Sequence, residues 1–280
     1  MKDLFSFVQF EFGFLLGPGD GRFLLRPGPG LDPERVLALR TLGAPERRRR
    51  RRRKRSVQEA EPEPVPTTRA TVIGAQPLAA PEARSWLERL RGDANLAEVE
   101  VAEALRHLNR ALHAYRVARA DPYAHDVSGR QALVVRLGFG DGESVAEGRY
   151  EEAWVLPAQR HQTRRSMEAP EERFAALLGA HERVLACEEL VLRARADLDA
   201  GRARQAALQA RVAIEAVLSE LEGSLPAERR AEVEDDRAVV GQAANAALAG
   251  ELPPELGRAL EDAVQRMERA LTARRLSTSA

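Results

Sequence analysis

Residues 181–221 carry the pattern that most restricts how this chain can fold. Apolar side chains recur every three or four residues before Gly201 and again after it, which is the spacing that places them on one face of an α-helix. Glycine readily takes the left-handed backbone conformation that ends many helices, so the pattern predicts two antiparallel helices joined at Gly201. Their expected buried stripes are Val184, Cys187, Val191, Ala194 and Leu198 in the first and Ala207, Ala210, Ile214, Val217 and Leu221 in the second.

Further helices are expected around this pair, because two helices cannot bury both stripes alone. Proline is well tolerated in the first turn of a helix, and we expect helices to begin at Pro170, at Pro226 and at the pair Pro253 and Pro254, with Ser224 as a candidate N-cap. Their expected apolar residues are Phe174, Leu177 and Leu178, then Val233, Val240, Ala244 and Leu248, and finally Leu256, Leu260, Val264, Met267 and Leu271. The sequence therefore predicts a helical bundle over residues 168–276.

The first 80 residues instead indicate a small β domain. Residues 8–16 place apolar side chains at even positions, with Gln9, Glu11 and Gly13 between them, which is the period of a half-buried strand. The turn residues 17–21 and the apolar run 22–26 then predict a hairpin. Residues 36–42 are a strand or a short helix, with the strand favoured because an isolated hairpin is barely stable, and residues 69–75 are the last strand. The predicted fold class is α+β, with a small antiparallel sheet at the N-terminus, a mostly α-helical remainder and a C-terminal helical bundle.

A cationic segment interrupts this β domain. Residues 46–68 combine nine consecutive basic residues with an acidic, proline-rich stretch and almost no apolar side chains, a composition typical of disorder. The basic residues are Arg47, Arg48, Arg49, Arg50, Arg51, Arg52, Arg53, Lys54 and Arg55. Such a run binds phosphate backbones by releasing counterions, without sequence preference. Alternatively, it is a solubilising linker or folds back on the acidic remainder of the chain.

Residues 81–167 are expected to contain two helices followed by a glycine-rich β and loop region. The helices are predicted to begin at Pro81 and at residue 96, where Asn95 is a candidate cap. The loop region that follows contains the densest group of polar side chains and glycines. The candidate pocket residues are Asp121, His125, Asp126, Gly138 and Gly140.

None of these residues matches a motif with established chemistry. Gly138 and Gly140 follow an apolar run, but a dinucleotide-binding loop requires a third glycine where Glu143 stands. His125, Asp126 and Ser128 supply the side chains of a nucleophilic triad, but they are too close in sequence to imply its geometry. No two histidines are three or four residues apart, so no helical zinc site is predicted. We assign no catalytic residue, no metal ligand and no cofactor.

The cysteine usage and the hydropathy pattern predict a cytoplasmic protein. Cys187 is the single cysteine and lies on an expected apolar stripe, so it is predicted to be a core residue in a reducing compartment. Gln9 and Glu11 interrupt the apolar N-terminus, which argues against a signal peptide. No apolar run reaches the ~20 residues that span a bilayer, so no membrane span is expected.

The helix pair at residues 181–221 resembles the paired helices of HEPN-type domains, through the segment ACEELVLRARADLDAGRARQAALQARVAIEAVLSELE. HEPN ribonucleases are RNA-cleaving dimers that use an arginine followed, four to six residues later, by a histidine. No histidine follows Leu221, and Arg119 and His125 have such a spacing only outside the helix pair. The resemblance therefore implies a non-catalytic member. Residues 8–26 and 121–143 are also similar to uncharacterised proteins of high-GC Gram-positive bacteria, which implies no activity.

Three functions remain open at this point. The first is a non-enzymatic binding or scaffold protein whose helical bundle contacts a protein partner or a second copy of itself. The second is a HEPN-like RNA-associated protein that uses the arginine-rich loop for nucleic-acid contact. The third is a small-molecule enzyme with a site near His125.

Overall fold

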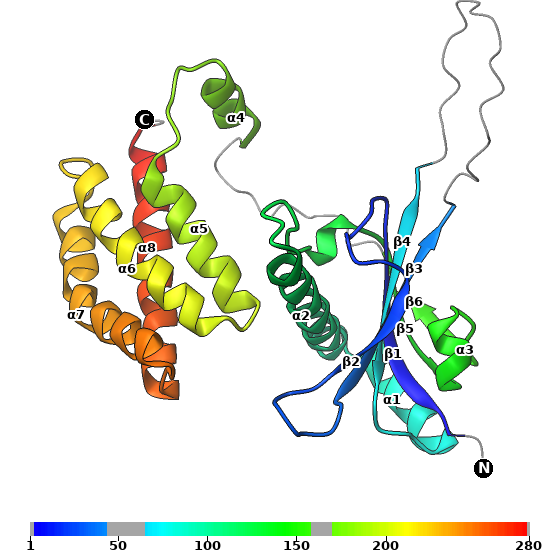
Figure 1. Ribbon diagram of the computed structural model, residues 1–280. Coiled ribbons are helices and arrows are strands. Elements are labelled where there is room, and N and C mark those ends of the chain that lie inside the picture. Colours follow the sequence, from blue (N-terminus) through cyan, green and yellow to red (C-terminus); the bar gives the residue numbers. More distant parts are fainter. Residues whose placement is uncertain (1–2, 44–64, 158–169, 279–280) are drawn as a thin grey trace, which may run out of the picture. The chain divides into compact units, whose positions relative to one another are not determined.

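The computed structural model describes residues 3–43, 65–157 and 170–278. The chain divides into two compact units, Met1–Arg160 and His161–Ala280 (Figure 1). The first unit combines a β-sheet with helices, and the described part of the second unit is helical. The α+β class expected from the sequence is confirmed.

One six-stranded sheet organises the first unit. Its order is β2-β3-β4-β1-β5-β6, and all neighbouring strands are antiparallel. The strands are β1 (Phe5–Phe12), β2 (Gly21–Leu25), β3 (Arg35–Leu42), β4 (Thr67–Gly74), β5 (Ala132–Gly140) and β6 (Glu152–Val155). The strand favoured at residues 36–42 and the one expected at 69–75 are therefore present. Because β5 pairs with β1, residues 1–80 and the region that follows them share one sheet.

The hairpin predicted from the turn at residues 17–21 is wrong. β1 pairs with β4 on one side and β5 on the other, whereas β2 pairs with β3 at the edge of the sheet. The reason is that β1 is buried on both faces: Phe7 is 1% exposed, Phe10 is 0% and the intervening Gln9 is 1%. A strand buried on both faces is best placed in the centre of a sheet covered from both sides, so the turn leads away from β1 instead of folding back along it.

Helices cover the two faces of this sheet unequally (Figure 1). On one face, α1 (Ala80–Gly92) and α2 (Ala94–Arg119) bury the main core of the unit. This core contains Val8, Phe10, Phe12, Leu37, Leu39, Ala70, Val72, Leu87, Leu108, Leu112, Leu137 and Phe139. On the other face, the short α3 (Gly142–Ala146) packs only on the end that carries Phe7 and Ile73. The remainder of that second face carries polar side chains.

The capping residue of α2 differs from the prediction. Asp93 occupies the N-cap position, and its carboxylate accepts hydrogen bonds from the backbone N–H groups of Asn95 at 2.9 Å and Leu96 at 3.3 Å. Asn95 lies inside the first turn. A carboxylate at this position satisfies free N–H groups and also faces the positive end of the helix dipole.

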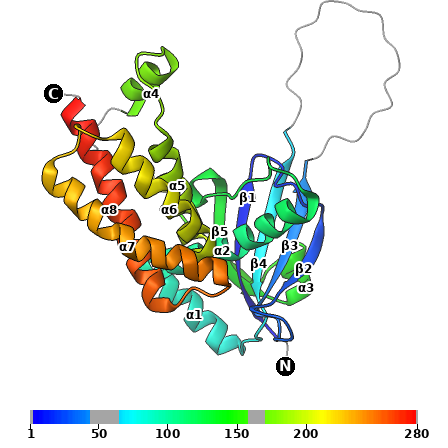
Figure 2. The same cartoon turned by 60° about the vertical axis from the view of Figure 1, so that its left-hand side comes forward.

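The second unit contains the predicted bundle, shown from a second direction in Figure 2. Its helices are α4 (Pro170–Leu178), α5 (Ala186–Asp199), α6 (Ala203–Glu220), α7 (Ala227–Ala249) and α8 (Pro254–Thr278). Gly201, with φ of 73°, separates α5 from α6 as expected. The core of the bundle includes Cys187, Val191, Ala194, Ala207, Ala210, Ile214, Val217, Leu221, Val233, Val240, Leu260, Val264, Met267 and Leu271.

Several details of the predicted bundle need correction. Phe174 and Leu178, which were expected among the buried apolar residues of α4, are 62% and 72% exposed. Val184 and Leu248 are 65% and 67% exposed, because α5 begins only at Ala186 and Ala247 takes the inward position near the end of α7. Ser224 does not cap α7, since its hydroxyl donates to the carbonyl of Leu221 and thereby closes the turn after α6.

Charged side chains connect helices of the bundle at defined positions. Arg266 on α8 donates two hydrogen bonds to Asp236 on α7, at 2.6 and 2.7 Å, and Asp236 is only 6% exposed. The carboxylate of Glu220 at the end of α6 accepts from the backbone N–H of Cys187 at 2.9 Å, and this hydrogen bond lowers the Glu220 pKa. Burial, and then the hydrogen bond to Glu220, raises the pKa of the Cys187 thiol to about 12, so the cysteine is a protonated core residue.

Replacing Asp236 tests this internal ion pair. Asp236→Ala leaves the Arg266 guanidinium without its bidentate partner, and breaking a buried pair costs roughly 3–5 kcal/mol. Arg266 is one-third exposed, so we expect a smaller loss of about 2 kcal/mol in the free energy of unfolding. Urea unfolding followed by helical circular dichroism measures it. Asp235→Ala removes the same charge from the exposed neighbouring position and should change stability by less than about 0.5 kcal/mol; equal losses would contradict the account.

Candidate nucleic-acid interface

The predicted cationic loop connects two strands that pair with each other. β3 and β4 are antiparallel, and their last hydrogen-bonded partners are Leu42 and Thr67. Residues 43–66 therefore leave one strand of the sheet and return to its direct neighbour. The basic residues Arg47–Arg55 lie outside the described residues, but both ends of their connection are defined by the sheet. The basic run is thus anchored to the first unit at two points.

Arginines also line the sheet face that α3 leaves uncovered. Residues directly opposite each other on neighbouring strands point to the same face, and the pairing places Arg40 opposite Arg69, and Arg69 opposite Glu11. On the same face, two residues before Glu11 in β1, Gln9 is opposite Arg136 of β5. Arg40 is exposed and lies two residues before the end of β3. We call Glu11, Arg40, Arg69 and Arg136 the sheet arginine cluster.

One carboxylate connects two of these arginines. An oxygen of Glu11 accepts from Nη1 of Arg136 at 2.7 Å and from Nε and Nη2 of Arg69, each at 3.3 Å. The side chains of Glu11, Arg69 and Arg136 are only 16%, 21% and 20% exposed. Three guanidinium groups with one carboxylate leave the cluster with a net positive charge.

Buried polar side chains hold the cluster in position. Gln9 accepts a hydrogen bond from Nη1 of Arg136 at 3.0 Å and donates one to the Thr71 hydroxyl at 3.1 Å. Gln9 and Thr71 are each 1% exposed, and buried polar groups with satisfied hydrogen bonds restrict the conformations of their neighbours. Arg69 is confined on another side by Gly148, where φ is +83° and a Cβ would collide with the guanidinium. These contacts restrict the conformations of the Arg69 and Arg136 side chains.

The residues predicted to form a pocket are divided by the structure. Asp121, His125 and Asp126 line a surface pocket of about 330 Å³, together with Tyr123, Gln131 and residues 14–17. Gly138 and Gly140 do not line it, because they lie at the opposite end of β5 from Gln131, roughly 25 Å away at the ~3.3 Å rise per strand residue. The expected cluster of five residues therefore does not form.

Both glycines are explained by close backbone packing. A Cβ at Gly138 would collide with the backbone of Glu152 and Ala153 on β6, and a Cβ at Gly140 would lie 3.0 Å from the backbone of Tyr150 and Glu151. The absence of a side chain at both glycines thus lets β6 and the residues just before it pack closely against β5. In the pocket itself, the backbone N–H of Tyr123 donates to Asp121 at 2.9 Å, and His125 is exposed.

Neither a metal site nor a membrane span is found in the described residues. No group of three or more His, Cys, Asp or Glu side chains within them could hold a metal ion. Within the same ranges, no helix is both long and apolar enough to cross a bilayer.

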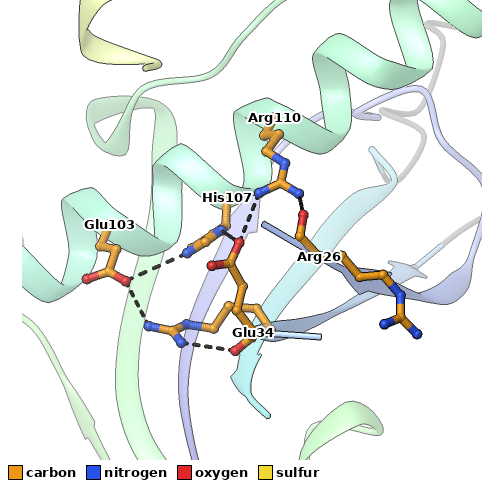
Figure 3. Close-up of polar contacts among 6 residues, drawn as sticks. Arg26, Glu34, Glu103, His107 and Arg110 are labelled. Carbon is orange, nitrogen blue, oxygen red and sulfur yellow. Dashed lines mark hydrogen bonds and ion pairs between the residues drawn. The ribbon is translucent and has the colours of Figure 1, made fainter. Parts of the chain in front are cut away.

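A second charged network joins α2 to the start of β3 (Figure 3). Glu34 accepts from Arg110 at 2.9 Å, and Glu103 accepts from Arg35 at 2.8 Å. His107 lies between the two carboxylates, with its ring nitrogens 3.7 Å from each. Arg110 also donates to the carbonyl of Arg26. The network therefore fastens the connection between β2 and β3 to the helix.

Burial disfavours the protonated form of His107. Burial lowers the pKa of His107 most, and the nearby Arg35 lowers it further, against the opposing effect of Glu34 and Glu103. Both carboxylates already bind an arginine, so little negative charge is left to stabilise an imidazolium. His107 is consequently a neutral, structural histidine near pH 7.

The sequence contained a signal for the sheet arginine cluster. The alternation in residues 8–16 predicts that Gln9 and Glu11 face solvent, and it singles out none of the arginines. Only the pairing of β1 with β4 and β5, and of β3 with β4, brings Gln9 and Glu11 together with Arg40, Arg69 and Arg136. The available indication of this cluster in the sequence was the presence of one arginine within each of three separate strands.

Titration of His107 gives a testable pH dependence. Its folded pKa lies below the ordinary value of 6.5, so the unfolded chain binds the proton first, and the first unit should lose stability as the pH falls below ~6.5. His107→Gln should remove this part of the pH dependence, seen as a smaller difference in unfolding free energy between ~pH 7.5 and ~pH 5.5. His125→Gln, at an exposed position, is the control. An unchanged pH dependence in His107→Gln would contradict the assignment.

Comparisons of the chain with protein-family models, with curated proteins and with solved structures found no match.

Proposed function

We propose that this chain is a non-enzymatic binding protein whose first unit contacts the phosphate backbone of nucleic acid. The observation that carries the proposal is that residues 43–66, which contain the nine consecutive basic residues, connect the paired strands β3 and β4 of the sheet that also carries Arg40, Arg69 and Arg136. Nine consecutive cations and the sheet arginines are thus contributed by one structural unit.

The chemistry of this surface favours backbone contact over base recognition. Lysine and arginine bind phosphates and release condensed counterions, which gives affinity without sequence preference and a steep dependence on salt. No aromatic residue interrupts the basic run, so base stacking by that segment is not expected. We therefore expect binding to both single-stranded RNA and duplex DNA.

Anchoring at both ends also affects binding. A cationic tail that orders on a ligand loses conformational freedom along its whole length. A connection whose ends are held by β3 and β4 has already lost part of that freedom.

The two other functions expected from the sequence receive less support. Most residues of the predicted apolar stripes are buried in the core of the bundle itself. Single exposed apolar residues such as Leu192 and Val212 are common on protein surfaces and are no evidence of a partner. The pocket beside His125 is open, with its imidazole in solvent, whereas catalytic sites usually exclude water. A protein partner, self-association and the HEPN-like relationship stay predictions from the sequence.

Replacing residues 47–55 by a Gly-Ser segment of equal length tests the proposed function. Fluorescence anisotropy with labelled single-stranded RNA and duplex DNA over a salt series measures affinity and its salt slope. We expect the replacement to weaken binding at least about tenfold and to reduce the slope of log K against log salt by several units, since each lost phosphate contact contributes about 0.7–0.9.

A polyglutamate peptide of similar charge is the control ligand. We expect it to bind the intact protein much more weakly than RNA does. Two outcomes would contradict the proposal: nucleic-acid binding that is unchanged by the replacement, or polyglutamate binding as tight as that of RNA.

A further inference from the structure

The sheet arginine cluster has an arrangement of charge that stability alone does not explain. Arg40 and Arg69 are directly opposite each other on β3 and β4, and like charges at such positions destabilise a sheet. Glu11 is the single acidic strand residue among these arginines. It forms ion pairs with Arg69 and Arg136, whereas no ion pair between Glu11 and Arg40 is found in the described residues. The face therefore holds more positive charge than its own carboxylate balances.

The geometry around Glu11 is that of an anion site. Three N–H donors from two guanidinium groups converge on one carboxylate oxygen, at 2.7, 3.3 and 3.3 Å. Arginine groups present several donors in a fixed planar arrangement that suits carboxylates and phosphates equally. An oxygen of a phosphodiester could occupy the place of this carboxylate oxygen without repositioning the donors.

The cluster is both ordered and partly open to solvent. Gln9 holds Arg136 through a hydrogen bond of 3.0 Å and is itself held by Thr71, so the Arg136 side chain has little freedom to lose on binding. About a fifth of the Arg69 and Arg136 side chains is exposed, which leaves part of each accessible. The α3 helix packs at the other end of this face, on Phe7 and Ile73.

We infer that Arg69 and Arg136 form an ordered phosphate-binding subsite, and that Glu11 occupies this subsite in the unbound protein. The inference rests on the proposed function and deepens it: the loop supplies non-specific attraction, while the subsite receives one phosphodiester group of the bound strand at a fixed position. Arg40 adds a further positive charge beside it. Binding releases the Glu11 carboxylate to solvent and transfers its two arginines to the phosphate.

Glu11 is consequently an internal competitor of the ligand. Its removal should strengthen nucleic-acid binding, because the phosphate no longer has to displace a carboxylate. The size of the increase is diagnostic only against a second carboxylate of the same face, because the loss of any nearby negative charge also strengthens the binding of a polyanion.

The Glu11→Gln variant, compared with Glu143→Gln, tests the inference. Glu143 lies on α3 at the same face, pairs with Arg22 at 3.4 Å and is 85% exposed, so its replacement removes the same charge without freeing the cluster. With labelled single-stranded RNA at fixed salt, we expect Glu11→Gln to raise affinity about threefold to tenfold and Glu143→Gln to change it less than twofold. Equal effects of the two variants would overturn the subsite.

Arg136→Gln provides the complementary measurement, with Arg22→Gln as its control. We expect Arg136→Gln to weaken binding about threefold to tenfold and to lower the salt slope by about one. In the Glu11→Gln/Arg136→Gln double variant, the gain produced by Glu11→Gln alone should disappear. Circular dichroism establishes whether each variant is folded. If Glu11→Gln does not fold, the comparison of Arg136→Gln with Arg22→Gln tests the subsite alone. Equal effects of those two variants would reject the subsite.

The outcomes also separate this inference from the proposed function. If replacing residues 47–55 weakens binding while Glu11→Gln and Arg136→Gln behave like their controls, the protein binds nucleic acid through its loop and the subsite is refuted. If the intact protein binds neither RNA nor DNA at low salt, the proposed function fails and the subsite fails with it.

Discussion

The pairing of β1 between β4 and β5 is the interaction on which the first unit depends. β1 contributes Phe7 to one face of the sheet and Phe10 and Phe12 to the other, and all three are at most 1% exposed. Burying such side chains is worth roughly 1.5–3 kcal/mol each, and it requires neighbours on both sides. Strands separated by more than 50 residues in the sequence are thereby brought together, and the turn after β1 has to lead to an edge strand.

The same pairing determines where charge is placed. Once the register aligns Gln9 with Thr71 and Arg136, and Glu11 with Arg69, the polar residues of β1 must share a face with the arginines of β4 and β5. The β3–β4 register adds Arg40 and sets the two points from which residues 43–66 leave and rejoin the sheet. Strand order therefore places Arg40, Arg69 and Arg136 on one face of the sheet.

Helical parts of the structure were predicted well because their signals are local. The spacing of Cys187, Val191 and Ala194 is sufficient to identify a buried stripe, and the break at Gly201 follows from a residue that tolerates positive φ. Strand partners are not local information, so the pattern of β1 revealed a strand but not its neighbours. The sheet arginine cluster was missed for that reason, whereas Asp121, His125 and Asp126 adjoin because they lie close together in one loop.

Nuclear magnetic resonance can locate the residues of the first unit that contact nucleic acid. Isotope-labelled protein would be titrated with a short single-stranded RNA at low salt, with the arginine Nε–Hε signals followed alongside the backbone. The account predicts that the largest shifts of described residues occur at Arg69, Arg136 and Gln9, with smaller ones at Arg40. Shifts confined to the helical bundle, or to residues 43–66 with Arg69 and Arg136 unaffected, would contradict a nucleic-acid interface that includes the sheet.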